Sequence, residues 1–411
     1  MPSQPFRFIH ASDFHLEQPL YGFSEIPDHL RNMLIDAPYI AAQRVFEAAV
    51  MNEVDFLVLS GDILHCDNGG PRAISFLLEQ FERLAERQIA VYWAGGRVDS
   101  PDRWPSAVQL PANVRFFPQG RADEQTHFRG DRPLAKLMGL SGGGRQVNAS
   151  DFHPGLGDQF TIAVAHGRAD AEALAEQGIN YWALGRSHRR KTLFTTPGTA
   201  HYCGTHQARS PRETGAHGCT LVHVDQQGQV RSQLITMDAV RFRQERITLD
   251  HNAKRDDLER QLRDRVQSLV ADAADRSTLI SWNIEAAERI GGQLRHGGLA
   301  DELVALLRRD FGHGSPPIWT ISLELEPHAA WPDAYYQEDT ISGDFLRAVR
   351  DYENDELAPL DFEPYLSERH LAGSVASAVQ LDDPPDRRRV LRDAAALAVA
   401  LLRGDEQETR T

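Results

Sequence analysis

Residues 8–16 read Phe-Ile-His-Ala-Ser-Asp-Phe-His-Leu, an apolar run that leads directly into Asp13 and His15. The apolar run predicts a buried strand. In α/β sheets, ligand sites gather at the carboxyl ends of the strands. An aspartate and a histidine two residues apart at such an end can both point at one cation, so this stretch predicts a metal or phosphate centre.

The same pattern recurs at three later predicted strands, 54–59, 160–165 and 181–184, and most of these ends also carry a glycine. A lone histidine after a strand is usually a hydrogen-bonded loop residue, so each end by itself says little. Four such ends in order predict a shared metal or phosphate centre. The candidate ligands at these ends are Asp13, His15, Asp62, His166 and His188.

Short apolar strands alternate with amphipathic helices over about residues 1–240, which predicts an α/β domain with strands covered on both faces. The composition changes near residue 240. Residues 247–326 predict a small α+β capping domain, and residues 327–411 an acidic linker followed by a helix at 387–403. That helix either docks on its own domain or binds a partner.

The chain has 411 residues, three cysteines and a formal net charge of −15. Three cysteines make neither a disulfide framework nor a zinc motif, which indicates a reducing cytoplasm. The strand at the very start argues against a signal peptide, and the longest apolar run falls far short of the roughly 20 residues that span a bilayer. The acidity argues against nonspecific affinity for nucleic acid, but it leaves room for a local basic groove.

The ordered motifs Asp-x-His, Gly-Asp, His-Gly and Gly-x-x-His resemble those of the calcineurin-like metallophosphoesterases. Their surroundings, including Phe56 to Ile63 and Tyr181 to Gly185, resemble the SbcD/YhaO-type DNA repair exonucleases. The resemblance covers about residues 5–225. It implies a two-layer β-sandwich flanked by helices, hydrolase activity on phosphodiesters, and two manganese-like ions that clamp the phosphate.

Carried over by position, the first ion would be bound by Asp13, His15, Asp62 and His188, a mixed set that suits Mn²⁺, Fe²⁺ or Zn²⁺. The second ion would keep only Asp62 and His166. The family's third motif reads Gly-Asn-His-Asp, and here Gly96 replaces the asparagine ligand and Arg97 the catalytic histidine.

Arg186 stands where a histidine ligand of the second ion is expected. Arginine cannot ligate a cation and stays protonated, so we expect one ion rather than two, and Arg97 cannot serve as a general acid. We expect Arg97 and Arg186 to form a phosphate clamp in place of the second ion. His65, Cys66, Asp67 and Asp99 are alternative ligands if a loop shifts.

A basic segment follows the last candidate ligand. It is either a binding surface for a polyanion or a solvated loop. Between residues 185 and 212 it has six positive charges and no Asp or Glu, in Arg186, Arg189, Arg190, Lys191, Arg209 and Arg212. Beside a phosphoesterase centre, this charge predicts contact with a polyanion such as DNA. We assign Arg97, Arg186, Arg189, Arg190 and Lys191 to phosphate or DNA binding.

Three functions remain open from the sequence. The first is metal-dependent hydrolysis of DNA phosphodiesters. The second is a catalytically inactive pseudo-nuclease that binds DNA ends and scaffolds an SMC-like, SbcC-like coiled-coil ATPase, a partner that the resemblance implies. The third is phosphatase action on a small phosphoester. We expect no membrane partner, and homodimerisation is left open.

Overall fold

The computed structural model describes residues 4–23, 26–66, 70–142, 146–154, 159–250, 253–272, 276–286, 290–291, 293–294, 298–326, 333–354, 390–392, 394–395, 398–399 and 402. The chain divides into two compact units. Unit 1 comprises Met1–Arg243, Ala273–Leu279 and Gly314–Pro317, and unit 2 comprises Gln244–Asp272, Ile280–His313 and Ile318–Thr411. The predicted boundaries at 240 and 326 remain predictions.

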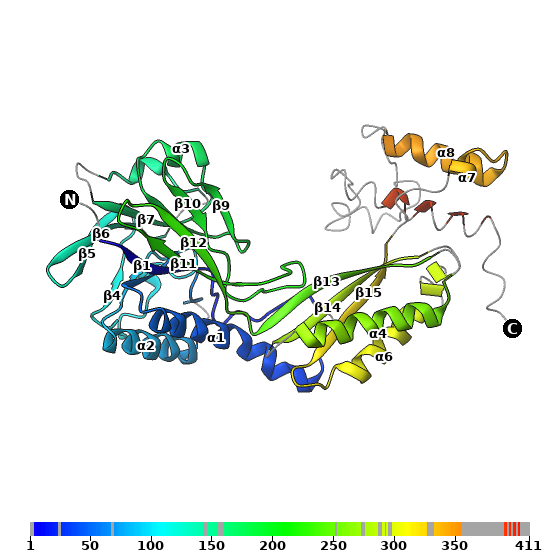
Figure 1. Cartoon of the computed structure of the whole chain (residues 1–411), viewed down its shortest axis with the longest axis horizontal. Helices are drawn as coiled ribbons and strands as arrows, with labels where there is room; N and C mark the ends of the chain where they lie inside the picture. Colours follow the sequence, from blue (N-terminus) through cyan, green and yellow to red (C-terminus); the bar gives the residue numbers. More distant parts are fainter. Residues whose placement is uncertain are drawn as a thin grey trace. The chain divides into compact units, whose positions relative to one another are not determined.

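The first sheet of unit 1 is built around β1 (Phe6–Ala11), which pairs in parallel with β2 (Phe56–Leu59) and antiparallel with β11 (Gly218–Val224). Its six strands follow the order β12-β11-β1-β2-β3-β4 (Figure 1). The remaining strands are β3 (Ala90–Trp93), β4 (Val114–Phe116) and β12 (Val230–Thr236).

The second sheet of unit 1 follows the order β5-β6-β7-β8-β10-β9. Its strands are β5 (Asp123–Arg129), β6 (Arg132–Leu140), β7 (Phe160–His166), β8 (Tyr181–Gly185), β9 (Lys191–Phe194) and β10 (Thr199–Tyr202). The pairs β6–β7, β7–β8 and β8–β10 are parallel. The parallel pairing brings the carboxyl ends of β7 and β8, which bear His166 and the His188 turn, to one edge.

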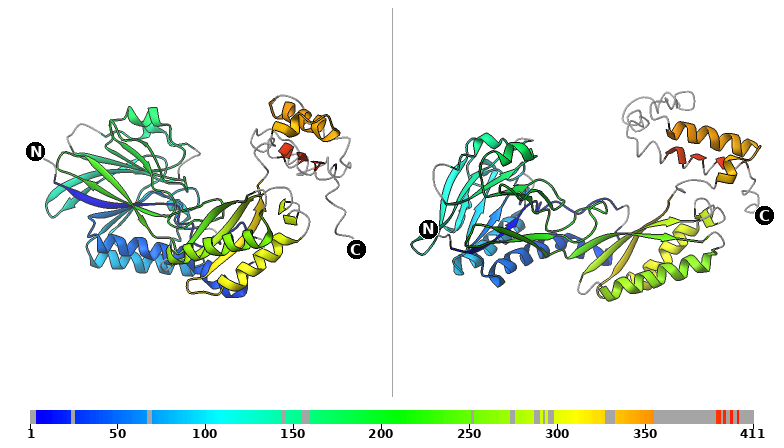
Figure 2. Two further views of the ribbon diagram at one scale, coloured as in Figure 1. Left: turned by 45° about the vertical axis from the view of Figure 1, so that its right-hand side comes forward. Right: turned by 45° about the horizontal axis from the view of Figure 1, so that its top comes forward.

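The two sheets pack face to face through a shared core that includes Phe8, Phe56, Tyr181 and Val222. The opposite face of the first sheet packs against α1 (Asp28–Met51) and α2 (Pro71–Glu86), as Figures 1 and 2 show. The short helix α3 (Ala171–Ala175) contributes to a core on the outer face of the second sheet. Two 3₁₀ turns lie at Pro101–Arg103 and Ala149–Asp151. The predicted α/β class, two sheets flanked by helices, is therefore confirmed.

Helix α1 is longer than predicted. The apolar spacing predicts a helix only from residue 40 to 51, whereas α1 begins at Asp28 and contains Pro38. Proline removes one helical N–H and usually ends or kinks a helix. Here Leu34, Ala37 and Ala41 around it are buried, so packing compensates for the lost hydrogen bond.

Unit 2 is centred on a three-stranded sheet, β13-β14-β15, with α4 and α6 on one face (Figure 2). Its core contains Leu258, Leu262, Ile280, Trp282 and Leu303. The elements are β13 (Val240–Thr248), α4 (Arg255–Asp272), β14 (Ser277–Glu285), α6 (Leu299–Phe311), β15 (Ile318–Leu325), α7 (Asp333–Tyr336) and α8 (Ile341–Asn354). The sequence predicts β14, β15, α4 and α6, but not β13, α7 or α8.

Most of the predicted acidic linker and C-terminal helix lies outside the described residues, including 355–389 and 403–411. Within the described part of that helix, Ala395 and Val399 are buried against Leu346 of α8. That face of the helix is therefore occupied by its own unit. Among the described helices, none is both long and apolar enough to cross a bilayer.

Candidate metal centre

The loops that follow β1 and β2 hold the first three candidate ligands in an uncommon backbone conformation. Asp13, His15 and Asp62 have φ values of 56°, 47° and 53°. Residues other than glycine seldom adopt positive φ, and they do so chiefly at functional sites. The two loops also pair with each other, because the Asp13 N–H donates to the Gly61 carbonyl and the His15 N–H to the Asp62 carbonyl, both at 2.9 Å.

Five side chains from four strand ends lie close together, in two overlapping groups that share Asp13. His166 Nε2 lies 3.3 Å from Asp13 Oδ1 and 3.4 Å from Asp62 Oδ2. His15 Nε2 lies 3.8 Å and 3.9 Å from the same two oxygens. His188 Nε2 lies 3.3 Å from His15 Nε2. Two overlapping groups, Asp13–His15–His188 and Asp13–Asp62–His166, have the spacing of metal ligands.

The two carboxylates each direct one oxygen toward this cluster and have the other held by donors. Asp13 Oδ2 accepts from the Ser12 hydroxyl at 2.6 Å and from the Arg186 N–H at 2.9 Å. Asp62 Oδ1 accepts from the N–H groups of Arg97 and Val98 at 2.7 and 3.1 Å. Each aspartate is therefore oriented to offer a single oxygen to a cation.

Two of the histidine ligands are held by a partner on their far ring nitrogen. His188 Nδ1 lies 2.7 Å from Glu213 Oε1, and His15 Nδ1 lies 2.9 Å from His65 Nε2. Such outer partners orient metal-binding imidazoles. The sequence prediction missed Glu213, although it is the first acidic residue after the basic segment. His65, expected to be an alternative ligand, instead contacts a ligand.

The electrostatics of the cluster favour cation binding. Burial lowers the pKa of His15 to about 2, so its ring is neutral and can ligate. Burial alone would raise the pKa of Asp13, but the hydrogen bond with His166 and the neighbouring imidazoles hold it well below its ordinary value. Burial opposes protonation of His166 and His188, yet hydrogen bonds to Asp13 and Glu213 raise the pKa of each. A buried cluster of carboxylates and imidazoles suits Mn²⁺, Fe²⁺ or Zn²⁺.

Asp99 is a structural residue of the 95–99 turn and not an alternative ligand. Its fully buried carboxylate accepts from the N–H groups of Asp62, Ile63 and Gly96, at 2.6 to 2.9 Å, and from the Trp93 indole at 3.1 Å. Burial and the nearby Asp62 charge raise the pKa of Asp99 to about 6. With four donors bound, this carboxylate has no lone pair aimed at the cluster.

The same turn leaves no room for an asparagine at position 96. A Cβ on Gly96 would lie 2.4 Å from Asp62 Oδ1 and 2.7 Å from the Asp62 backbone nitrogen. The backbone path at position 96 therefore requires glycine. Of the other expected alternatives, Cys66 is half-buried with its N–H donating to Val98, and Asp67 lies outside the described residues.

Two of the predicted phosphate-binding residues, Arg97 and Arg186, adjoin the cluster, and Arg189 and Arg190 line a cavity that also includes His188. Arg97, Arg186, Arg189, Arg190 and Lys191 are all exposed. The Arg97 and Arg186 backbones contact the two ligand carboxylates, and neither guanidinium has a partner in the described part of the chain.

Arg209 and three histidines, His201, His206 and His217, are buried. Arg209 is 2% exposed and donates to the carbonyls of His15, Gln18 and Pro19, so counting it in the basic surface was wrong. His201 is buried between the hydroxyls of Thr192 and Thr220. The other two, His206 and His217, are also buried. His217 nevertheless lines the cavity of about 290 Å³ described below.

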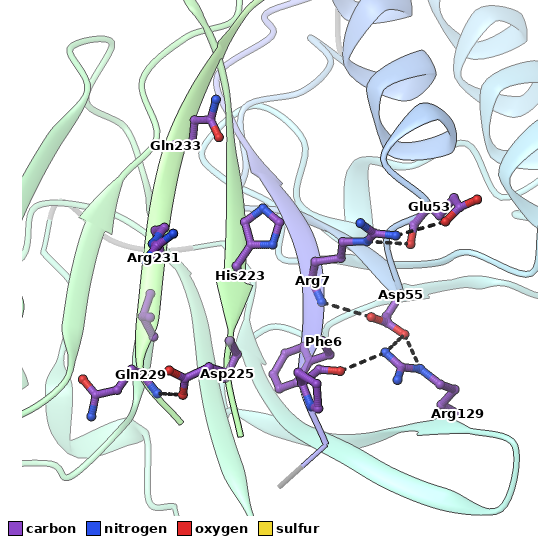
Figure 3. A pocket seen from close by; sticks show the side chains of 13 residues that line it. Phe6, Arg7, Glu53, Asp55, Arg129, His223, Asp225, Gln229, Arg231 and Gln233 are labelled. Carbon is purple, nitrogen blue, oxygen red and sulfur yellow. Dashed lines mark hydrogen bonds and ion pairs between the residues drawn. The ribbon is translucent and has the colours of Figure 1, made fainter. Parts of the chain in front are cut away.

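Two of the cavities lined by described residues of unit 1 bear on the centre. One, of about 290 Å³, is next to the cluster and is lined by His188, Arg189, Arg190 and Glu213 among others. The other, of about 890 Å³, is lined by Arg7, His223 and Arg231 at the opposite end of β1 (Figure 3). None of the five candidate ligands lines the larger cavity, so the cation centre is separate from it.

Comparison with known proteins agrees with this geometry. Over 232 residues the chain is 32% identical to the uncharacterized metallophosphoesterase YhaO of Bacillus subtilis strain 168, a match that covers 53% of this chain and 57% of that protein. The matched part of the chain is related to a metallophosphoesterase. No family model matches the chain. The match with this metallophosphoesterase spans little more than half of that protein's length.

Several solved structures are similar at low sequence identity. A dimetal phosphatase from Danio rerio aligns with 57% of this chain and 99% of its own, with 11% identity and a TM-score of 0.34. Vacuolar Protein Sorting 29 from Cryptosporidium parvum aligns with 57% of this chain and 99% of its own, with 14% identity and a TM-score of 0.26.

Proposed function

We propose that unit 1 is a one-cation, SbcD-like metallophosphoesterase domain that binds DNA phosphodiesters and hydrolyses them slowly or not at all. The observation that supports this most is the proximity of Asp13, His15, Asp62, His166 and His188, which form two overlapping groups that share Asp13. Each carboxylate offers one oxygen to this cluster. The position of the missing asparagine ligand, Gly96, is closed by the Asp62 backbone.

The bound ion would be Mn²⁺, Fe²⁺ or Zn²⁺, and it would polarise a phosphoryl oxygen as a Lewis acid. The protein's own contribution is positive charge at fixed places. The backbone N–H groups of Arg97 and Arg186 touch Asp62 and Asp13, so both side chains start beside the ligand carboxylates. A guanidinium binds phosphate bidentately, which makes these two arginines a phosphate clamp beside the ion.

Arg189, Arg190 and Lys191 extend this positive surface along the exposed loop after His188. A row of exposed cations beside a phosphate site suits the repeated charges of a nucleic-acid backbone better than a single small phosphoester. This favours DNA as the ligand. A small-molecule phosphatase remains the less favoured function.

The same residues favour a binding role over rapid hydrolysis. Expulsion of the leaving group requires a proton donor that titrates near neutral pH, and Arg97 occupies the expected position of that donor. A DNA-end-binding scaffold for a coiled-coil ATPase is therefore the second candidate function. Neither this partner nor a homodimer is needed for the chemistry proposed for the site.

The test is binding and cleavage of a fluorescent linear duplex and a single strand, with and without Mn²⁺. We expect Arg97→Gln and Arg186→Gln each to weaken binding several-fold and to reduce the salt dependence by about one phosphate contact. Arg231→Gln, which lines the distant cavity, is the matched control and should change neither quantity.

Cleavage is read in the same reactions. Turnover that Asp13→Asn abolishes would support the nuclease, and binding without turnover would support the scaffold. If the wild-type protein binds neither DNA form at low salt, the proposed DNA function is wrong.

A further inference from the structure

The loop between β10 and β11 brings its single carboxylate, Glu213, against the outer side of the His188 ring. We propose that Glu213 is a positioning residue: it fixes the ring nitrogen of His188 that carries the proton, and so directs the other nitrogen at the cation. This inference rests on the proposed one-cation centre, and Glu213 itself does not contact the ion.

The hydrogen-bond chemistry leaves one assignment for the ring. An ionised carboxylate only accepts hydrogen bonds, so a contact of 2.7 Å between Glu213 Oε1 and His188 Nδ1 requires the proton on Nδ1. In the neutral ring, Nε2 then has a free lone pair. That nitrogen is the one that lies 3.3 Å from His15 Nε2, within the ligand cluster.

The His15 ring is oriented in the same way, with its Nε2 atom toward the cluster. His15 Nδ1 lies 2.9 Å from His65, so its Nε2 also faces the cluster. Two lone pairs 3.3 Å apart repel unless a cation or a proton lies between them. By holding the proton on His188 Nδ1, Glu213 helps to keep these two lone pairs facing each other, and a bound cation removes their repulsion.

Glu213 is itself held in place by both of its oxygens and by its backbone. Its Oε2 accepts from the Arg209 N–H at 2.7 Å, and its N–H donates to the Ser210 carbonyl at 3.0 Å. The buried Arg209 guanidinium donates to the carbonyls of His15, Gln18 and Pro19, at 2.9 to 3.4 Å. One loop thus ties the His188 partner to the segment that carries His15.

The substitution Glu213→Gln separates positioning from simple packing because it keeps the size of the side chain. Its amide has one acceptor oxygen, whereas Glu213 accepts at two places, from His188 and from Arg209. If the amide oxygen stays with Arg209, its NH₂ faces His188 Nδ1 and drives the ring proton to Nε2. That proton then points at the cation site and blocks ligation.

Two readouts test the inference. In metal-free protein at a pH where the ring is neutral, the ¹⁵N chemical shifts of His188 should report an Nδ1–H tautomer for the wild type and a loss of that preference for Glu213→Gln. Calorimetry with Mn²⁺ should show affinity about 10–100-fold weaker, as is typical for loss of an outer partner of a ligand. The control Glu172→Gln, an exposed carboxylate on α3, should change neither readout.

The outcomes distinguish this inference from the proposed function. Unchanged tautomer and unchanged Mn²⁺ affinity in Glu213→Gln would overturn the role of Glu213. If the wild type binds no Mn²⁺, the one-cation centre fails, while the tautomer readout still decides whether Glu213 positions the ring. If Glu213→Gln does not fold, Glu213→Asp keeps both acceptors on a shorter side chain, and an Mn²⁺ affinity equal to wild type would contradict the proposal.

Discussion

Arg186 has an unfavourable backbone conformation, and its side chain is suited to binding phosphate. Its φ is 102°, a region that residues with a Cβ seldom adopt. Such strain costs roughly 1–3 kcal/mol and persists where function needs it. We predict that Arg186→Gly raises the free energy of unfolding by about 1 kcal/mol, since glycine adopts this φ without strain.

The same substitution should weaken binding of DNA or inorganic phosphate, because it removes one guanidinium of the clamp. In Arg186→Gly we therefore expect the free energy of unfolding, measured with urea, to rise while the affinity for phosphate falls. Arg189→Gly is the matched control, since Arg189 has an ordinary φ and glycine there should lower stability. Loss of stability in Arg186→Gly, or phosphate affinity equal to wild type, would contradict the account.

Gly96 gives a second prediction at the scale of one residue. Restoring the family's asparagine by Gly96→Asn should not create a second metal site, because its Cβ would lie 2.4 Å from Asp62 Oδ1 and 2.7 Å from the Asp62 nitrogen. We expect overpacking to lower the unfolding free energy by about 1–3 kcal/mol or more.

Thermal unfolding and metal analysis check the Gly96 prediction. The control Gly70→Ala meets only the Glu17 carboxylate, at 3.8 Å, and should be tolerated. A stable Gly96→Asn protein with two bound ions would show that the turn does not exclude the second site.

At the scale of elements, the cross-sheet contact between β3 and β5 makes stability depend on pH. His127 of β5 is buried and lies 3.0 Å from the Tyr92 hydroxyl of β3. Burial lowers the pKa of His127 to about 4, so the folded protein holds the ring neutral. The unfolded chain binds that proton below about pH 6.5, and the unfolding free energy therefore falls as the pH falls from about 6.5 toward 4.

The slope from His127 is at most about 1.4 kcal/mol per pH unit in that window, and the expected change between pH 6.5 and 5.5 is about 1 kcal/mol. Urea unfolding at pH 6.5 and 5.5 measures it. His127→Gln keeps a partner for Tyr92 but does not titrate, so its loss of stability over that pH unit should be smaller than the wild-type loss by about this amount. Equal losses in the two proteins would mean that His127 is not held neutral.

Elements differ in how well the sequence predicts them, for physical reasons. The strands buried on both faces, such as β1, β2 and β7, are continuous apolar runs and were predicted. Strand β5 was missed because it lies at a sheet edge with mostly exposed polar residues, so it has no apolar pattern. The first half of α1 was missed because Pro38 interrupts the expected spacing, and only tertiary packing retains the helix there.

At the scale of the whole molecule, the proximity of the candidate ligands could be predicted because each lies at the end of a strand, and parallel strands bring their ends together. The role of Glu213 could not, since it comes from a loop 25 residues beyond His188 and contacts it only through the fold. The same holds for Arg209, whose charge suggested a surface but whose three carbonyl contacts bury it.

The central claim is that the centre binds one cation, and counting metal per chain tests it most directly. After saturation with Mn²⁺ and removal of free ion, elemental analysis should find about one equivalent per chain. Asp13→Asn and His166→Gln should each reduce this value strongly, because both residues belong to the single cluster. Two tightly bound equivalents per chain in the wild type, or one that survives loss of His166, would contradict the account.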